Sequence, residues 1–374
     1  MPPTIVIDAR KLRDFGIGTY VRGLVGHLAG IDCAHRYVLL VRPDDHGAFG
    51  DLPANFSESL ERASGYSLRE AIGISSHLRR LRADLYHATH YTVPLWPPCP
   101  TVVTVHDVIH LLFPEFLPHR SALHYARFML RRATRKSRRV ITVSATTRDD
   151  LIATVGADPE RIRVIHNGVD QAFSRRLPPE EITQRLAPHG IAPPYLLFLG
   201  NPKPHKNLER LLDGYARAGR LLAAPPPPLV VAGARDGADA LRARADALGI
   251  AGSLAVAGWI PDQDLPALYQ GATLFTCPSL YEGFGLPVLE AMASGTAVLT
   301  SRGSALLEIA GGHADLVDPW DPDDIARGIA RCVGDEQHRR RLAEGGPVRA
   351  AQFGWERVAR ATLEVYREAL EEAA

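Results

Sequence analysis

The chain has 374 residues, of which 46% are hydrophobic, and this length and composition predict two or three globular domains with substantial cores. Its formal net charge of +1 excludes a strong overall attraction to nucleic acid. The four cysteines are scattered without a Cys-x-x-Cys pair, which indicates neither a zinc knuckle nor a disulfide framework and favours a reducing cytosol.

Short β-branched segments alternate with amphipathic helical stretches, which is typical of parallel sheets covered by helices. A strand begins at once, without the features of a signal peptide, and no segment reaches about 18 consecutive apolar residues, so we expect neither secretion nor a membrane span. Two series of strands are expected: 4–7, 37–41, 101–105, 140–143 and 163–165, then 195–199, 229–231, 254–257, 273–277 and 297–300. We therefore predict two α/β domains, 1–175 and 176–354, followed by a final helix from Trp355.

A glycine-containing loop joins the first strand to its helix. Gly16 and Gly18 precede a helical stretch, and a helix N-terminus after a strand can bind phosphate through its unpaired N–H groups. An ordinary turn explains the same glycines. The third glycine and the acidic residue of a dinucleotide-binding fingerprint are missing, so the sequence disfavours an NAD-type cofactor.

The expected strand 101–105 ends in His106 and Asp107. Open parallel sheets bind ligands at the carboxyl ends of their strands, so both side chains are candidates for a site. A histidine that merely packs in the core is the competing interpretation of His106. The sequence indicates no serine or cysteine nucleophile, because it has no Gly-x-Ser-x-Gly elbow and no cysteine beside an activating base.

One helical stretch is basic and lacks any acidic residue. No Asp or Glu occurs from Phe116 to Arg148, and the segment 120–139 combines apolar residues at helical spacing with a group of basic ones: Arg127, Arg131, Arg132, Arg135, Lys136, Arg138 and Arg139. A basic face in water is one interpretation, because the apolar residues are needed for packing on the sheet. The other is contact with an anionic acceptor or an anionic membrane surface.

Lys206 follows the first strand of the second series, in a loop that opens the next helix. An ammonium group at this position can meet a diphosphate as a point charge. A surface lysine at a turn is the simpler alternative.

Two Asp-x-Asp tripeptides, 262–264 and 321–323, could hold a metal ion with a diphosphate. Each precedes a helical stretch, and Asp321 before Pro322 is a good N-cap. We therefore predict helix capping and no metal.

The strongest functional pattern is the segment 278–293, which reads PSLYEGFGLPVLEAMA. Its glycines let backbone N–H groups approach a ligand, and its proline suits the first turn of a helix whose N-terminus attracts anions. Glu282 lies in the loop and Glu290 on the helix. Ionised carboxylates only accept hydrogen bonds, so the pair suits hydroxyl groups on either side of a phosphate, as in a nucleotide sugar. Taken singly, either glutamate could be an ordinary surface or first-turn residue.

This segment strongly resembles the signature of retaining glycosyltransferases with the GT-B fold, in the group 1 branch of glycogen-synthase-like and bacterial mannosyltransferase-like enzymes. The resemblance covers nearly the whole chain and is most specific at 278–293. It implies two Rossmann-like doubly wound domains that face an interdomain cleft. It also implies that the helix 355–374 crosses back onto the N-terminal domain, although the sequence alone equally allows that helix to pack where it ends.

The resemblance implies roles for the site residues. Glu282 approaches the donor sugar, and Glu290 binds the ribose. His106 faces the sugar without acting as a general base, and Asp107 orients it. The expected catalytic residues are His106, Lys206 and Glu282, and the expected donor-binding residues are Gly16, Gly18, Asp107, Asn201, Lys203, Gly283, Phe284, Gly285, Leu286 and Glu290.

The diphosphate clamp departs from the family pattern. Lys206 matches the lysine of that clamp, but Asn201 stands where arginine is usual. Asparagine cannot supply a second positive charge, which places a two-cation clamp in doubt. Lys203 or Arg302 could compensate by position.

We therefore expect a retaining hexosyltransferase of the cytoplasm that acts without a metal or other cofactor and binds no nucleic acid. It would move a hexose, with mannose from GDP-mannose favoured, to a glycan or lipid-linked acceptor in polysaccharide or glycoconjugate synthesis. Contact through 120–139 would place it on the inner face of the membrane. A nucleotide-sugar 2-epimerase of similar architecture and a nucleotide-sugar-binding protein without turnover are the alternatives.

Overall fold

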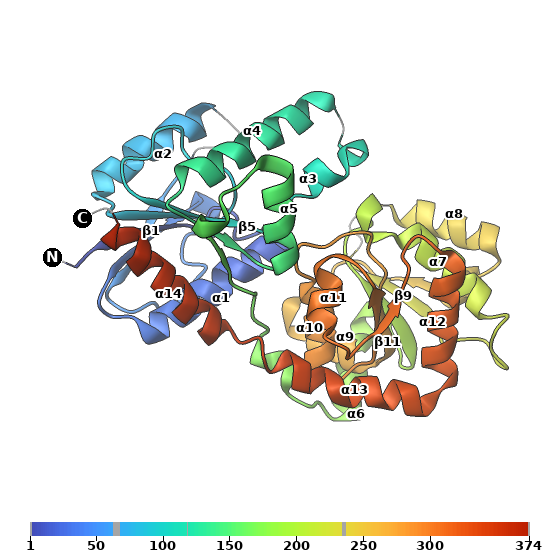
Figure 1. Ribbon diagram of the computed structural model, residues 1–374. Coiled ribbons are helices and arrows are strands. Elements are labelled where there is room, and N and C mark those ends of the chain that lie inside the picture. The colour runs from blue at the N-terminus through green and yellow to red at the C-terminus, as the bar shows by residue number, and fades with distance from the viewer. Residues whose placement is uncertain (1, 63–67, 118, 234–236, 373–374) are drawn as a thin grey trace. The chain divides into compact units, whose positions relative to one another are not determined.

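The computed structural model describes residues 2–62, 68–117, 119–233 and 237–372, and the chain divides into two compact units (Figure 1). Unit 1 comprises Met1–Gly168 with Gly354–Ala374, and unit 2 comprises Val169–Phe353. Each is a parallel sheet covered by helices, which confirms the predicted α/β class. The chain leaves unit 1 after Gly168, earlier than the expected boundary at 175.

The sheet of unit 1 is seven-stranded and parallel, in the order β3-β2-β1-β4-β5-β6-β7. Its strands are β1 (Thr4–Asp8), β2 (Arg36–Val41), β3 (Phe56–Leu60), β4 (Leu85–Ala88), β5 (Thr101–Val105), β6 (Arg139–Thr142) and β7 (Ile162–Val164). The sequence pattern does not predict β3 or β4. β3 is an edge strand with a polar centre, FSESL, and β4 is short and contains His87.

Helices cover both faces of this sheet. One face carries α1 (Phe15–Ile31) and α14 (Trp355–Glu371). The other face carries α2 (Leu68–Leu81), α4 (Arg120–Lys136) and α5 (Ala145–Val155), and the short α3 (Ile109–Leu112) follows β5.

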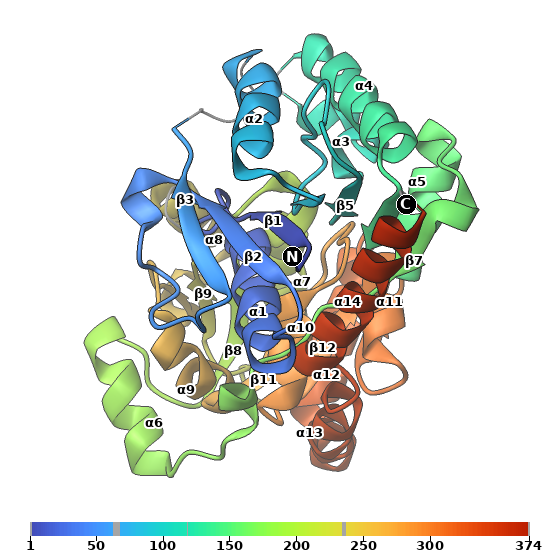
Figure 2. The ribbon, with the colours of Figure 1, turned by 90° about the vertical axis from the view of Figure 1, so that its left-hand side faces the viewer.

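The final helix belongs to unit 1. α14 lies beside α1 (Figures 1 and 2) and buries Trp355, Leu363 and Tyr366. A Cβ atom on Gly23 would lie 2.3 Å from the Trp355 ring, and one on Gly168 would lie 2.5 Å from the Trp355 backbone nitrogen. This packing requires glycine at both positions, and it decides between the two locations that the sequence left open for the helix.

The sheet of unit 2 is six-stranded and parallel, in the order β10-β9-β8-β11-β12-β13. Its strands are β8 (Tyr195–Leu199), β9 (Leu229–Ala232), β10 (Leu254–Val256), β11 (Ala272–Cys277), β12 (Val298–Ser301) and β13 (Asp315–Val317). Five of them match the expected series. β13 is missed, because it is only three residues long and begins with an aspartate, a residue that is depleted in strands.

The helices of unit 2 also lie on both sides of its sheet. α7 (Leu208–Ala218), α8 (Ala238–Leu248) and α12 (Pro322–Gly334) share one core cluster with the strands. α9 (Leu265–Gln270) and α10 (Leu286–Ala293) contact β11. The remaining helices are α6 (Pro179–Leu186), α11 (Ser304–Ala310) and α13 (Glu336–Ala350).

Each sheet has one point at which the strand order reverses. In unit 1 this switch point lies between β1 and β4, and in unit 2 it lies between β8 and β11. Open α/β sheets bind ligands beyond the carboxyl ends of the strands at such a point. Among the residues described, no helix is both long and apolar enough to cross a bilayer.

Candidate active site

Two loops meet at the switch point of unit 2, one after β8 and one after β11. The Leu280 N–H donates to the His205 carbonyl at 2.8 Å, which joins the loops directly. Asn207 is buried, and its side-chain amide donates to the carbonyls of Pro278 at 2.9 Å and Pro319 at 2.6 Å. Asn207 has a φ of 60°, a conformation that asparagine tolerates better than most residues. Sequence reasoning did not select it, although this tolerance is a usable signal.

Lys206 and Glu282 form an ion pair at this point. The Lys206 Nζ lies 2.7 Å from the Glu282 Oε1, and the two side chains are only 20% and 13% exposed. Burial alone would raise the pKa of Glu282, but attraction and hydrogen bonding from Lys206, aided by Ser279, outweigh it and bring that pKa below its usual value. The structure thus unites the expected diphosphate cation and the expected sugar contact in one charged pair.

The helix predicted within 278–293 begins at Leu286, with Pro287 in its first turn. Gly285 precedes it with a φ of 105°, and a Cβ atom there would lie 2.7 Å from the Leu306 Cδ2. Glycine is therefore needed both for the backbone conformation and for space. Gly283 and Phe284 are buried, and the Phe284 ring meets the Phe353 ring edge-on. The loop that carries Glu282 is consequently held on both sides.

Glu290 lies on α10 and is partly buried. Its Oε2 accepts a hydrogen bond from the Tyr269 hydroxyl at 2.8 Å. Burial raises the pKa of Glu290 to about 7, and the negative charges of Asp262 and Asp170 add to this rise while the Tyr269 bond opposes it. No local pattern reveals Tyr269 as the partner, because it lies on α9, which precedes β11 in the chain, whereas Glu290 lies on α10, which follows β11.

The candidates for a second phosphate cation differ in their surroundings. The Arg302 guanidinium is paired with Asp324, which weakens the case for Arg302. Lys203 is exposed and has no carboxylate partner within the described part of the chain. Its backbone N–H donates to the Asn201 carbonyl at 2.7 Å. Lys203 is therefore the better placed of the two to supplement Lys206.

One of the two aspartate pairs behaves as predicted. The Asp321 Oδ1 accepts from the Asp323 N–H at 2.9 Å and caps α12, which confirms the capping interpretation there. Asp264 does not cap α9 with its side chain. It instead lies 3.2 Å from the His189 Nε2 and 3.8 Å from the Arg185 Nη1, so the capping prediction is wrong for Asp264.

The predicted glycine loop of unit 1 is shorter than the sequence suggests. α1 begins at Phe15, so Gly16 and Gly18 lie within its first turn rather than before it. A Cβ atom on Gly18 would lie 2.1 Å from the Leu12 carbonyl oxygen. Close approach of the preceding loop thus explains Gly18, whereas Gly16 is exposed at the helix start.

His106 stands at the carboxyl end of β5. Its Nε2 lies 2.9 Å from the Thr89 carbonyl oxygen, and its ring meets the Tyr20 ring edge-on at 5.1 Å. A carbonyl only accepts, so Nε2 carries the proton and Nδ1 is left as an acceptor. Burial lowers the pKa of His106, which keeps the ring neutral near pH 7. Such a ring can accept a hydrogen bond from a hydroxyl group.

Asp107 acts on its own loop. Its Oδ1 accepts from the Ile109 N–H at 3.1 Å, which fixes the turn between β5 and α3. It therefore orients the segment that carries His106 instead of bonding the imidazole. At the end of β1, Asp8 and Arg10 form a buried ion pair with 2.6 Å between Oδ2 and Nη2, a pair that sequence reasoning did not select.

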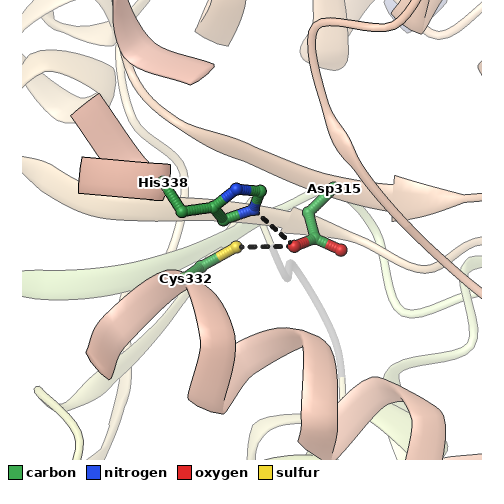
Figure 3. A group of neighbouring side chains, drawn as sticks. All are labelled: Asp315, Cys332 and His338. Atoms are coloured by element: carbon green, nitrogen blue, oxygen red, sulfur yellow. Dashed lines mark hydrogen bonds and ion pairs between the residues drawn. The ribbon is translucent and has the colours of Figure 1, made fainter. Parts of the chain in front are cut away.

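Within the described residues, one group of side chains has metal-ligand chemistry: Asp315, Cys332 and His338 (Figure 3). The His338 Nε2 donates to the Asp315 Oδ2 at 2.8 Å, and the Arg331 Nε donates to the same oxygen at 2.7 Å. The second oxygen also accepts from Arg331. The carboxylate is thus already neutralised by a guanidinium, which would repel a metal ion. We interpret the group as a structural junction of β13, α12 and α13.

Comparisons with known proteins identify both units. Residues 183–349 match the family model described as "Glycosyl transferases group 1", and residues 16–173 match that described as "Glycosyltransferase Family 4". An O-antigen chain mannosyltransferase B from Escherichia coli is 30% identical over 298 residues, which are 78% of this chain and 76% of the relative. An MMP alpha-(1->4)-mannosyltransferase from Mycolicibacterium hassiacum is 32% identical over 247 residues, 65% of this chain and 57% of that protein.

A solved structure agrees with the fold. Sucrose-phosphate synthase from Thermosynechococcus elongatus superposes with a TM-score of 0.78 at 20% identity, and the match covers 100% of both chains. At this level of identity the likeness concerns the architecture.

Proposed function

Because this chain belongs to the group 1 glycosyltransferases and has their two-domain GT-B fold, we propose that it transfers a hexose from a nucleotide sugar to a glycan or lipid-linked acceptor with retention of anomeric configuration. GDP-mannose is the favoured donor and mannose the transferred sugar, since two relatives are mannosyltransferases by name. The proposal includes polysaccharide or glycoconjugate synthesis at the cytoplasmic face of a membrane.

The observation that carries the proposal is the ion pair between Lys206 and Glu282 at the switch point of unit 2. A donor brings a diphosphate, which needs positive charge, and a sugar, which offers hydroxyl donors. Lys206 supplies the charge, and the ionised Glu282 beside it supplies acceptors. Glu290, on the helix that follows, offers a second carboxyl for the ribose hydroxyls.

In the proposed reaction the acceptor oxygen attacks the anomeric carbon from the face that the diphosphate leaves. The bond from that carbon to the phosphate oxygen breaks, and the acceptor proton passes to the departing diphosphate. The nucleoside diphosphate thus leaves with the bonding electron pair and the proton. Lys206 stabilises the charge that develops on the diphosphate, which is the kind of preorganised electrostatic effect that dominates many enzymes.

We assign the unprotonated Nδ1 of His106 to a hydroxyl of the donor sugar. The Thr89 carbonyl fixes the tautomer through Nε2, and the neighbouring Tyr20 ring fixes the plane of the imidazole. Asp107 holds the turn that follows. A neutral ring in this state positions the sugar, and no proton transfer through it is required.

The proposal includes activity without a metal ion. Asp321 is occupied as a helix cap and Asp264 as an ion-pair partner, while Lys206 provides the charge that a metal would otherwise supply. Turnover is therefore expected to persist in excess EDTA. Loss of activity in EDTA with recovery on adding Mg²⁺ or Mn²⁺ would contradict this part of the proposal.

A panel of nucleotide sugars tests the function. Thermal shift identifies the donor, because a ligand that binds the native state stabilises it by mass action. The selected donor, labelled in its sugar, is then incubated with the protein and candidate acceptors. A glycosylated product with retained configuration supports the proposal. A free C2 epimer would identify an epimerase, and bound sugar without turnover would identify a binding protein.

A further inference from the structure

Helix α4 presents two opposite faces. Its inner face buries Ala126, Met129, Leu130 and Ala133 in the core of unit 1. The residues of its outer face recur every three to four positions and line an open hollow of about 380 Å³. We call this outer face the α4 face; the residues used below are Arg127, Phe128, Arg131, Arg132, Arg135 and Lys136. The helix has 17 residues, so the face is about 25 Å long.

No acidic side chain within the described residues neutralises the α4 face. None of its five cations is paired with an aspartate or glutamate there. The adjacent Arg139 differs, because it pairs with both Glu368 and Glu372. Several arginines without acidic partners on one helix face destabilise the helix, since like charges at this spacing repel each other. Such an arrangement favours a partner that supplies negative charge.

Arg132 is the basic side chain of the α4 face whose guanidinium is held in a fixed orientation. Its Nη2 donates to the carbonyls of Pro94, at 3.2 Å, and Leu95. Its Nε is buried and makes no hydrogen bond, and burial lowers the pKa of the guanidinium. The backbone therefore orients this group, but no carboxylate of the described ranges accompanies it.

Aromatic side chains accompany the cations. The loop that Arg132 contacts continues to Trp96, which is 65% exposed, and Phe128 on the α4 face is 57% exposed. Exposed aromatic rings beside guanidinium groups suit the interface of a bilayer, where rings enter the headgroup region and cations meet lipid phosphates. A single-stranded nucleic acid would instead follow a groove with successive stacking platforms, whereas the cations here lie along one helix, α4 (Figures 1 and 2).

We propose that the α4 face docks on an anionic membrane surface. Arg127, Arg131, Arg132 and Arg135 contact lipid phosphates, and Trp96 and Phe128 enter the interfacial layer. This assignment deepens the proposed peripheral location but uses no residue of the donor site.

Flotation with vesicles at low ionic strength tests the docking. The full-length protein is expected to float with phosphatidylcholine vesicles that contain phosphatidylglycerol and to stay in solution with phosphatidylcholine alone. Replacing Arg127 and Arg131 by glutamate should weaken binding about 30-fold or more, because each basic residue near an anionic leaflet contributes about fivefold. Salt at 1 M should abolish it, because the Debye length falls to about 3 Å.

A matched control separates local contact from net charge. Arg242→Glu with Arg340→Glu changes the net charge equally at exposed positions of unit 2 and should float as the wild type does. Trp96→Ser with Phe128→Ser keeps the charge and should weaken binding, which tests the entry of the rings.

Three results would overturn the proposal: a wild-type protein that stays soluble, an equal loss in the control pair, or equally tight binding of a single-stranded oligonucleotide. Transfer to a soluble acceptor is measured in parallel. Since the α4 variants leave the donor site intact, this rate should stay nearly constant, so failure of docking is distinguishable from failure of the proposed function.

Discussion

At the scale of single residues, the candidate site of unit 2 depends on charges that are partly buried and specifically paired. The Lys206 ammonium and the Glu282 carboxylate stabilise each other across 2.7 Å, so that neither can be removed without leaving the other uncompensated. Among the described residues Glu290 pairs with the Tyr269 hydroxyl and with no cation, so burial raises its pKa and it holds its proton more tightly. The two glutamates therefore differ in how readily they ionise before any ligand binds.

Lys206→Ala is expected to lower kcat/KM by about 10² to 10³, the scale for losing one preorganised charge-stabilising group. The protein should remain folded by circular dichroism. The double variant with Glu282→Gln measures how much of the loss comes from the orphaned carboxylate. Lys203→Ala is the comparison, and a loss of tenfold or less in Lys206→Ala with a larger loss in Lys203→Ala would move the clamp to Lys203.

Substitutions of the two glutamates should affect the binding of different parts of the donor, the nucleotide and the sugar. Glu290→Ala is expected to weaken nucleoside diphosphate alone as much as the intact donor, because the ribose is common to both. Glu282→Ala should weaken only the intact donor, because its assigned partner is the sugar. Calorimetric titration of each variant with both ligands measures this, and equal effects on nucleotide binding would reject the assignment.

The raised pKa of Glu290 predicts a pH dependence with a definite sign. In the folded protein this pKa is about 7 against 4.5 for the free side chain, so the native state binds the proton more tightly. Its contribution to stability is complete below pH 4.5 and is lost as the pH rises to about 7, by up to about 3 kcal/mol. Denaturant unfolding of wild type and Glu290→Gln across this range measures the difference, and parallel pH profiles would exclude it.

At the scale of helices and strands, buried polar junctions join elements that are distant in the sequence. In unit 1, the Tyr366 hydroxyl on α14 is hydrogen-bonded to the His87 Nδ1 on β4 at 2.6 Å. The His87 Nε2 is hydrogen-bonded to the Thr104 Oγ1 on β5 at 2.8 Å. The Tyr20 hydroxyl on α1 reaches the same Thr104 oxygen at 3.0 Å. Both helices that cover this face of the sheet, α1 and α14, are thereby linked to β5, the strand that ends before His106.

In unit 2, Asp315→Asn tests the corresponding junction of β13 with α12 and α13. The substitution removes the charge that Arg331 and His338 share and should lower the free energy of unfolding by about 3 kcal/mol. Asp323→Asn is the control, because its pair with Arg217 is exposed and contributes about 1 kcal/mol or less. Urea unfolding at pH 7 measures both.

The sign of the pH effect follows from the pKa of Asp315. Burial raises this pKa, but the hydrogen bonds and charge of Arg331 and His338 lower it by more, so the folded value lies below 3.8. The contribution is complete above that pH and disappears as the pH falls through the folded pKa. Equal losses in Asp315→Asn and Asp323→Asn would contradict the structural role of the junction.

At the scale of the whole molecule, the two units differ in how the chain builds them. Unit 2 is continuous, and its ends meet where the Val169 N–H donates to the Phe353 carbonyl at 3.0 Å. Unit 1 is discontinuous, because α14 completes its core after the chain has formed unit 2. Unit 1 therefore needs the last residues of the chain, and unit 2 does not.

Ending the chain after Phe353 should consequently affect one unit only. Unit 1 would lose the buried side chains of α14 and is expected to unfold or aggregate, whereas residues 169–353 alone should fold and bind nucleoside diphosphate. Thermal shift of the isolated fragment with and without GDP or UDP measures this. A fragment that shows no cooperative transition would refute the independence of unit 2.

The sequence by itself determined the features that depend on neighbouring residues. The alternation of strands and helices, the start of α10 beside its glycines and proline, and the Asp321 cap all follow from local backbone preferences and periodicity. The family resemblance added the donor-site candidates. Local patterns failed where strands are short or polar, as in β3, β4 and β13, and at Asp264, whose partners come from elsewhere.

Only the tertiary structure decided which distant groups meet. Lys206 and Glu282 are 76 positions apart, and Glu290 and Tyr269 are on different helices. Strand order brings the first pair together because β8 and β11 are neighbours at the switch point. The place of α14 was decided in the same way, by the space that Gly23 and Gly168 leave for Trp355. Such contacts depend on the packing of whole elements, which no local window of sequence contains.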